Sequence, residues 1–276
     1  MTCEVKNVAV IGLGKMGGPI SRHLAKGNFN VIGYDISEAV CSAAALCGIK
    51  IATSPGEASA NADLVIVIVA FEEDVKRVCF GDDGITTRAQ PGTKVGVAAT
   101  ISPGGMNEIA AGLMAKGLIP LDIPLCRGER PAEAGQLLIT GGGEPAAFEA
   151  CRPAFATFAN SIYRIGPVGS GQVGKMINNM ILWACICANN EAFKLAGMYP
   201  VDFDVLYEML LDSSASNWAM ATRVDEQPMP WAEKDMMIAL TEADRLRVAL
   251  PLNGTVKEVV KSIKLNRNEH FPYDGK

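Results

Sequence analysis

Strand-like apolar runs alternate with helical patterns through the first 165 residues of this 276-residue chain. The runs are rich in Val, Ile and Leu, and Leu64–Ala70 is apolar throughout, which is typical of a strand covered on both faces. This alternation indicates βαβ units, so we expect an α/β fold with a doubly wound, mainly parallel sheet. Strands are expected at 7–11, 30–34, 64–70, 94–98, 118–122 and 136–140, and helices at 19–26, 37–47 and 104–116.

The pattern changes after about Gly166, beyond which strand-like runs disappear. Ser170–Gly197 is expected to form one long helix, with Ser170 as its candidate N-cap and Gly197 as the glycine after its last turn. Further helices are expected at 201–211, 231–246 and 252–265. We therefore predict two domains, one built on a sheet at 1–165 and an all-helical one at 166–276.

Composition excludes several classes of protein. Hydrophobic residues make up 49% of the chain and charged residues 20%, which indicates an ordered core rather than extended disorder. No apolar run approaches the roughly 20 residues that a membrane-spanning helix needs, and no secretory signal pattern opens the sequence. The net charge of −5 argues against a nucleic-acid surface. We expect a cytoplasmic protein that binds neither membranes nor nucleic acids.

The eight cysteines include no CxxC pair and no Cys/His spacing typical of a metal site, and the chain has only two histidines. A zinc site is therefore not expected. A disulfide framework is not expected either, since the chain is large and lacks a secretory signal. The cysteines are predicted to be reduced and mostly buried thiols.

A glycine-rich loop, Gly12–Gly17, follows the first expected strand and opens the first expected helix. In a GxGxxG in this context, Gly12 permits a tight turn, Gly14 lets the backbone approach a pyrophosphate, and Gly17 lets helix and strand pack closely. The phosphates would lie at the helix N-terminus, where free N–H groups favour anions. The alternative is a tight glycine turn with no ligand. The predicted cofactor contacts in the loop are Gly12, Leu13, Gly14, Lys15, Met16 and Gly17.

An acidic residue, Asp35, follows the second expected strand. A carboxylate at this place can accept hydrogen bonds from both hydroxyls of an adenosine ribose and would repel a 2′-phosphate, which favours NAD over NADP. The alternative is that Asp35 caps the helix that starts near Ser37. Ligands of open parallel sheets bind outside the carboxyl ends of the strands. Further candidate contacts at those ends are Val69, Ala70, Asp74 and Thr100.

Lys175 and Asn179 are four residues apart in the long expected helix, so they share one helix face. A lysine in the second turn lies where the helix dipole disfavours its positive charge, and a nearby oxidised nicotinamide would do the same. Such a lysine suits general acid/base catalysis, and Asn179 could hold a hydroxyl or carboxylate without adding charge. The alternative is an exposed lysine and a surface amide.

Four ordered segments carry a resemblance to a known family. Val10–Pro19 closely resembles the amino-terminal signature of the β-hydroxyacid dehydrogenase family, and Gly169–Asn179 resembles its catalytic motif. Thr100–Pro103 and Lys234–Met236 resemble further segments of that family. The matches run in the family's order from about residue 6 to residue 240.

The resemblance implies a Rossmann domain followed by an all-helical domain, joined by a long helix, with the active site in the cleft between them. It implies that Lys175 is the general acid/base, that Asn179 orients the substrate, and that Lys234 lies near nicotinamide and substrate. Val69, Ala70, Asp74 and Thr100 match positions at which the family touches its cofactor. The family is usually dimeric or tetrameric, with the helical domain in the interface.

The substrate loop departs from the family's pattern of Asp-x-Pro-Val-Ser-Gly-Gly. Here residues 122–128 are Asp-Ile-Pro-Leu-Cys-Arg-Gly, which makes Cys126, Arg127 and Gly128 candidate substrate contacts. An arginine offers a fork of donors suited to carboxylate, sulfonate or phosphate, and family members that act on sulfolactaldehyde are similar at this loop. The alternative is that Arg127 points to solvent or pairs with Glu129 or Glu133.

These patterns predict an NAD-dependent oxidoreductase that interconverts a small β-hydroxy acid and its aldehyde or keto form. One alternative is a reductase of a sulfonated or otherwise strongly anionic aldehyde, because of Arg127. An imine reductase is disfavoured, since such enzymes typically carry Asp or Tyr where Lys175 stands. A non-catalytic dinucleotide-binding module is the alternative from another class.

Overall fold

The computed structural model describes residues 4–223, 228–267 and 269, so Cys3 lies outside the described part of the chain. The chain divides into two compact units, Met1–Lys175 and Met176–Lys276. This division falls ten residues later than the boundary expected at residue 165, because the start of the long helix packs with the first unit. Within the described residues, no helix is both long and apolar enough to cross a membrane.

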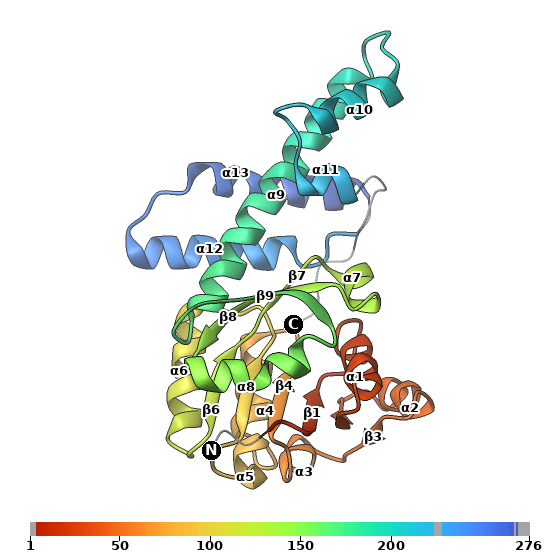
Figure 1. Cartoon of the computed structure of the whole chain (residues 1–276). Coiled ribbons are helices and arrows are strands. Elements are labelled where there is room, and N and C mark those ends of the chain that lie inside the picture. Colours follow the sequence, from red (N-terminus) through yellow and green to blue (C-terminus); the bar gives the residue numbers. More distant parts are fainter. Residues whose placement is uncertain (1–3, 224–227, 268, 270–276) are drawn as a thin grey trace. The chain divides into compact units, whose positions relative to one another are not determined.

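The first unit is built on one mixed sheet (Figure 1) with the strand order β3-β2-β1-β4-β5-β6-β8-β7, in which β9 pairs with β8. Neighbours from β3 to β6 are parallel, whereas β8 runs antiparallel to β6 and to β7. The expected mainly parallel sheet is confirmed. The strands are β1 (Asn7–Ile11), β2 (Asn30–Tyr34), β3 (Lys50–Ile51), β4 (Leu64–Val67), β5 (Lys94–Val97), β6 (Ile119–Asp122), β7 (Leu125–Cys126), β8 (Leu137–Gly143) and β9 (Ala159–Gly166).

Helices cover both faces of this sheet, as the continuous apolar strands require. In β1, Val8 and Val10 belong to one buried cluster and Ala9 and Ile11 to another, because successive side chains of a strand point to opposite faces. Helices α1, α2, α7 and α8 contribute to the first cluster, and α3 to α6 to the second. These helices are α1 (Gly17–Lys26), α2 (Glu38–Leu46), α3 (Pro55–Ser59), α4 (Glu72–Phe80), α5 (Ile85–Arg88), α6 (Pro103–Met114), α7 (Glu129–Glu133) and α8 (Pro145–Phe155).

Several short elements and one edge strand were not expected from the sequence. Strand β9 mixes half-buried and exposed residues, so it lacks the apolar run that marks the central strands. Helix α8 contains Pro153, which normally argues against a helix interior. The expected strand 64–70 ends at Val67, because the chain leaves the ladder after the bond from Ile68 N–H to the Ile11 carbonyl (2.8 Å).

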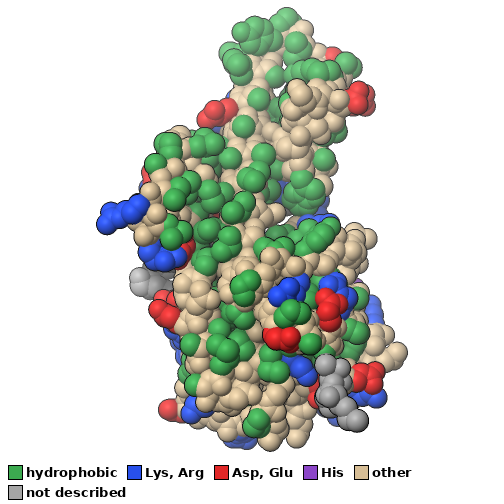
Figure 2. All heavy atoms as spheres, turned by 60° about the vertical axis from the view of Figure 1, so that its left-hand side comes forward, with side chains coloured by type: hydrophobic (Ala, Val, Ile, Leu, Met, Phe, Trp, Pro, Cys, Tyr) green, Lys and Arg blue, Asp and Glu red, His purple; other side chains and the backbone are tan. Residues whose placement is uncertain are grey.

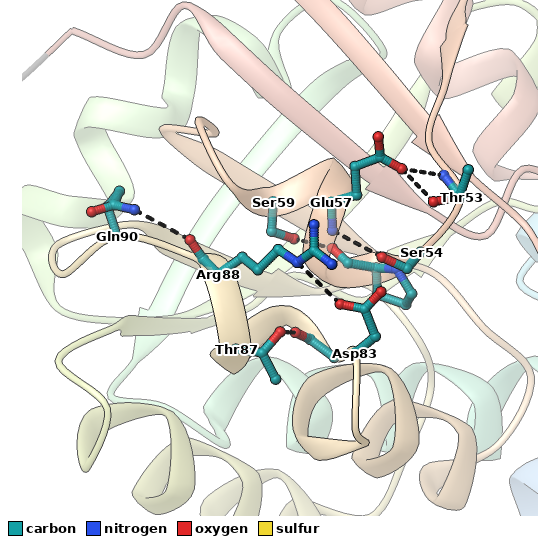
Figure 3. A network of polar contacts seen from close by, with 10 residues as sticks. Thr53, Ser54, Glu57, Ser59, Asp83, Thr87, Arg88 and Gln90 are labelled. Atoms are coloured by element: carbon teal, nitrogen blue, oxygen red, sulfur yellow. Dashed lines mark hydrogen bonds and ion pairs between the residues drawn. The ribbon is translucent and has the colours of Figure 1, made fainter.

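Polar contacts gather around α3 and α5 (Figure 3), and the Gly56 N–H of α3 donates to the Asp83 carbonyl just before α5 (2.8 Å). Ser54 caps α3 by accepting the Glu57 N–H (3.0 Å), and Thr53 donates its N–H and hydroxyl to the Glu57 carboxylate (2.6 and 2.5 Å). These bonds from Thr53 lower the pKa of Glu57. Asp83 pairs with Arg88 (3.1 Å), whose carbonyl accepts the side-chain amide of Gln90 (3.3 Å).

The second unit is entirely helical in its described residues. It comprises most of α9 (Ser170–Ala196), together with α10 (Phe203–Asp212), α11 (Trp218–Thr222), α12 (Ala232–Leu246) and α13 (Pro251–Asn266). Its core gathers around Trp183, Met236 and Val260. Large apolar side chains are exposed along α9, along α10 and in the segment between them, and Figure 2 shows hydrophobic side chains gathered on this unit. They include Ile181, Leu195, Met198, Tyr199, Val201, Phe203, Val205 and Met209.

Candidate active site

The three glycines of the Gly12–Gly17 loop differ in what surrounds them. Gly12 has φ of +97°, and a Cβ there would lie 2.3 Å from the Ile68 carbonyl oxygen. A Cβ on Gly17 would lie 1.8 Å from the Gly12 carbonyl oxygen, so both positions need glycine for packing alone. A Cβ on Gly14 would meet no atom within 4 Å. The fold therefore leaves space beside Gly14, where the sequence predicts the approach of a pyrophosphate.

The start of α1 fits an anion. The helix begins at Gly17, and its N-cap residue, Met16, makes no side-chain capping bond. No acidic residue lies in the first turn of α1. The positive end of the helix dipole is thus not neutralised by a local carboxylate, which is the condition for phosphate binding at a helix N-terminus. Lys15 is exposed next to this turn and forms an ion pair with Glu129 (3.4 Å).

The Asp35 carboxylate lies at the end of β2, beside the glycine loop. Its Oδ2 accepts the N–H of Leu13 (2.8 Å), and its Oδ1 accepts the N–H of Ser37 (2.9 Å). The cap of α2 is Ser37, whose hydroxyl accepts the Val40 N–H (3.4 Å), so the suggestion that Asp35 itself caps this helix is wrong. Each carboxylate oxygen has a second lone pair, which leaves acceptor capacity for ribose hydroxyls.

The other predicted cofactor contacts follow the ends of neighbouring parallel strands. Val69 and Ala70 follow β4, Thr100 follows β5, and all three are half-buried. Asp74 lies in the first turn of α4, where it accepts the Phe71 N–H (3.2 Å) and pairs with Arg77. These bonds occupy the Asp74 carboxylate in its own helix, so its predicted contact with the cofactor gains no support from its bonding.

Two buried polar side chains, Asp122 of β6 and Gln172 of α9, meet at the first turn of α9, and neither was predicted as a site residue. Asp122, the last residue of β6, accepts the N–H of Gln172 at Oδ2 (2.9 Å), and its Oδ1 has no partner among the described residues. Burial raises the pKa of Asp122, although the N–H groups of Gln172 and of nearby backbone oppose that shift. Ser170, the expected N-cap, is itself the first helical residue, and Asp122 supplies the capping carboxylate.

The Gln172 side chain reaches from α9 to the segment after β5. Its Nε2 donates to the Ala99 carbonyl (2.9 Å), and its Oε1 accepts the Ile101 N–H (3.1 Å). These two backbone groups flank Thr100. Both Gln172 and Asp122 are fully buried. In the sequence, Gln172 differs from its neighbours only as a long polar residue among the Gly, Ser and Val of residues 169–174.

Lys175 and Asn179 lie on α9, one turn apart, as the sequence predicts. Lys175 is half-buried, and the ion pairs formed among the described residues do not include its amine. Asn179 is 4% exposed, and its Oδ1 accepts the Asn178 side-chain amide (2.9 Å). This bond occupies one of the two lone pairs of the Asn179 oxygen.

The Arg127 guanidinium is held by the sheet. It donates to the Gln136 carbonyl (2.8 Å), to Asn160 Oδ1 (2.5 Å) and to Ser161 Oγ (3.0 Å). Pairing with Glu129 or Glu133, the suggested alternative, is wrong because those carboxylates pair with Lys15 and Arg22 instead.

The backbone around Arg127 is unusual. Both Arg127 and Gly128 have φ of 89°, a region that suits glycine and is rare for a residue with a side chain. Cys126, the last residue of β7, is buried. The predicted substrate loop is therefore shaped by bonds to β9 and by two consecutive left-handed residues.

Lys234 lies in the first turn of α12, in the helical unit. It is 8% exposed, and its amine lies 5.5 Å from the centre of the Trp231 ring. Its neighbours fix the turn, because Asp235 accepts the indole N–H of Trp183 (3.0 Å) and Glu233 pairs with the fully buried Lys264 (2.9 Å).

No group of three or more His, Cys, Asp or Glu residues suited to a metal ion occurs in residues 4–223, 228–267 and 269. The seven cysteines in those ranges are free thiols. The glycine loop, the uncapped start of α1 and the Asp35 carboxylate together fit a dinucleotide.

Two family models cover nearly the whole chain. Residues 7–166 match the NAD binding domain of 6-phosphogluconate dehydrogenase. Residues 169–270 match the model described as NAD-binding of NADP-dependent 3-hydroxyisobutyrate dehydrogenase.

Individual relatives extend this likeness. The chain is 33% identical over 216 residues to the NAD-dependent L-serine dehydrogenase of Pseudomonas aeruginosa, covering 78% of this chain and 72% of the relative. It is 30% identical to the L-threonate dehydrogenase of Cupriavidus necator, covering 92% of this chain and 89% of that protein. A solved structure of Mycobacterium tuberculosis 3-hydroxyisobutyrate dehydrogenase with L-serine superposes with a TM-score of 0.87 at 27% identity, covering 98% and 97% of the two chains.

Proposed function

The chain belongs to the β-hydroxyacid dehydrogenase family of NAD(P)-dependent dehydrogenases, and we propose that it interconverts a small β-hydroxy acid and its aldehyde or keto form. The observation that carries this proposal is the intact pair of Lys175 and Asn179 on one face of α9. The first turn of this helix is anchored in the same compact unit as the glycine loop. A lysine held there, outside the ion pairs of the described residues, suits proton transfer.

In the proposed oxidation, the Lys175 amine takes the proton of the substrate hydroxyl as the C–O double bond forms. A bound nicotinamide would supply the acceptor for the hydride that leaves the same carbon. In the reverse direction, the Lys175 ammonium returns the proton to the developing alkoxide oxygen. Asn179 orients the hydroxyl or carboxylate through its amide, so that proximity and orientation supply much of the rate.

We propose NAD rather than NADP as the physiological cofactor. The support is the Asp35 carboxylate at the end of β2, whose charge would oppose a 2′-phosphate and whose lone pairs would accept the ribose hydroxyls. Gly12, Gly14 and Gly17 would form the pyrophosphate loop. Leu13, Lys15, Met16, Val69, Ala70, Asp74, Thr100 and Lys234 complete the proposed cofactor contacts.

The substrate is proposed to be a carboxylic acid rather than a sulfonate. The names of the relatives point to small hydroxy acids, namely L-serine, L-threonate and 3-hydroxyisobutyrate. The sulfonated aldehyde was considered because of Arg127. The guanidinium of this residue donates three hydrogen bonds within the protein, to Gln136, Asn160 and Ser161. Cys126, Gly128, Asn179 and Lys234 remain the proposed substrate contacts, with Lys175.

We also propose that the protein works as a homodimer or homotetramer. The support is the exposed apolar surface of the helical unit, where Met198 is 81% exposed and Val205 63% exposed. Surfaces of this kind mark protein interfaces. Light scattering coupled to size exclusion would measure the assembly.

The test of the proposed function is NADH absorbance on incubation with NAD and L-serine, L-threonate or 3-hydroxyisobutyrate, with a β-hydroxy sulfonate as a comparison. We expect turnover with at least one hydroxy acid, and turnover lower by at least about 10²-fold in the K175A variant. Binding of NAD by calorimetry without turnover of any compound would favour a non-catalytic dinucleotide-binding module. Turnover of the sulfonate alone would instead support a role for Arg127 in binding the anionic group of the substrate.

A further inference from the structure

The side chain of Gln172 joins the helix that carries Lys175 to the segment that carries Thr100. It is fully buried, and its amide satisfies the carbonyl of Ala99 and the N–H of Ile101, the residues on either side of Thr100. Both bonds lie within the first compact unit. A buried amide that meets two backbone groups with donor and acceptor cannot be replaced by an apolar side chain without leaving both groups unsatisfied.

The backbone of the same residue is held by Asp122. The Gln172 N–H donates to Asp122 Oδ2 (2.9 Å), so the first turn of α9 is fixed to the end of β6 as well as to the segment after β5. Main chain and side chain of Gln172 therefore connect two neighbouring strand ends with one helical turn.

Close packing leaves this turn little freedom to shift. A Cβ on Gly171 would lie 2.6 Å from the Thr140 carbonyl oxygen and 2.7 Å from Asp122 Oδ2. A Cβ on Gly174 would lie 2.2 Å from the Thr140 hydroxyl. The two glycines let α9 lie directly against β8, which makes the place of the turn depend on its polar bonds rather than on adaptable side chains.

We propose that Gln172 is a positioning residue that couples the segment Ala99–Ile101 to the first turns of α9, and so sets the place of Lys175 relative to the bound cofactor. This inference rests on the proposed function, because Thr100 is a proposed cofactor contact and Lys175 the proposed acid/base. Gln172 itself touches neither cofactor nor substrate in this scheme. Its effect passes through the two backbone groups that it holds.

The coupling predicts that cofactor binding at the end of β5 orders the start of α9. Hydrogen–deuterium exchange measures this without any substrate. In the wild-type protein, NAD should slow exchange in peptides that contain Ala99–Ile101 and in peptides that contain Gly171–Lys175. In the Q172M variant, which keeps the side-chain length and loses both bonds, NAD should slow exchange only in the first set.

Turnover gives a second readout. A misplacement of about 1 Å can cost roughly 10²-fold in rate, so we expect Q172M to lower kcat by at least about 10-fold while the KM for NAD changes much less. The primary deuterium isotope effect on kcat should rise, because hydride transfer becomes slower relative to product release. A residue that only stabilises the fold would change the melting temperature and leave the isotope effect unchanged.

The matched control is Q90M. Gln90 lies in the same unit and is exposed, and its side-chain amide donates to the carbonyl of Arg88 (3.3 Å). Its substitution should change neither the exchange pattern nor kcat.

The wild-type exchange experiment requires no variant and decides the matter if Q172M does not fold. Unchanged exchange at Gly171–Lys175 on addition of NAD would overturn the proposal. So would retention of that protection, or of wild-type kcat, in folded Q172M. If no hydroxy acid is turned over by the wild type, the proposed function fails, and the exchange experiment still decides whether Gln172 couples the two segments.

Discussion

The carboxylate of Asp35 accepts the backbone N–H of Leu13 at 2.8 Å, which joins the end of β2 to the glycine loop that follows β1. The two residues are 22 positions apart in the sequence and come together because β1 and β2 are adjacent and parallel. One group thus shapes the loop and presents negative charge where an adenosine ribose would lie.

Asp35→Asn should weaken NAD binding and narrow the preference for NAD over NADP. Asparagine can still accept the Leu13 N–H, so the loop should persist while the charge that opposes a 2′-phosphate is lost. We expect roughly a 10-fold loss of NAD affinity by calorimetry, as for the loss of a charge-assisted hydrogen bond. Asp63→Asn is the control, because Asp63 accepts the Asn7 N–H (2.8 Å) at the start of β1. Equal effects of both substitutions on NADP binding would contradict the prediction.

Lys175→Ala should lower turnover by at least about 10²-fold, the usual scale of a lost acid/base group, with NAD binding retained. The measurement is kcat with the best substrate of the hydroxy-acid panel, accompanied by circular dichroism to verify folding. Lys194→Ala is the matched control, since Lys194 lies on the same helix and is exposed near its last turn. A K175A variant with wild-type turnover would remove Lys175 from the mechanism.

Arg127 is expected to matter for stability more than for substrate binding. Arg127→Ala removes the bonds to Gln136, Asn160 and Ser161, and we expect a loss of about 1–3 kcal/mol in the free energy of unfolding. Arg127→Gly removes the same bonds but relieves the positive φ, so it should be less destabilising than the alanine variant. Urea unfolding measures both. A large rise in the substrate KM with unchanged stability would instead indicate a direct role in binding.

Reactivity toward thiol reagents should separate the cysteines. Burial raises the pKa of the Cys79 and Cys151 thiols to about 12, whereas Cys47 is exposed. At mildly alkaline pH, we expect alkylation of Cys47 in the folded protein and modification of Cys79 and Cys151 only after unfolding, because the thiolate is the reacting form. Peptide mass spectrometry identifies the sites, and Cys47→Ser serves as the control. Early labelling of Cys79 would contradict its burial.

The buried carboxyl of Asp122 should make stability depend on pH. Burial raises its pKa in the folded state, so the folded protein binds a proton at this carboxyl more tightly than the unfolded chain does. The stabilising contribution is then complete below the ordinary Asp pKa and is lost as the pH rises through the raised value. Asp122→Asn removes this dependence, because an amide does not titrate in this range. We expect the melting temperature of the variant to rise relative to that of the wild type as the pH increases from acidic to neutral. A difference between the two melting temperatures that does not change with pH would contradict this.

The positions of the glycine loop, the central strands and the long helix could be predicted because their signals are local. The run Leu64–Val67 is apolar throughout, and this composition predicts its burial. The glycines at 12 and 17 likewise predict a tight turn. Edge strand β9 and helix α8 were missed because half-exposed residues and an internal proline give no such signal.

The sequence by itself determined the sheet class, the dinucleotide loop and the place of Lys175 and Asn179 on one helix, since each depends on residues within a few positions of one another. Only the tertiary structure decided the partners of Gln172, Asp122 and Arg127. Gln172 is 73 positions from Ala99 and 50 from Asp122, and Arg127 is 33 from Asn160. Gln172 meets Ala99 and Asp122 because the parallel strands β5 and β6 end side by side. Arg127 meets Asn160 because β7 and β9 both pair with β8. A polar side chain finds its partner there by geometry that no local pattern records.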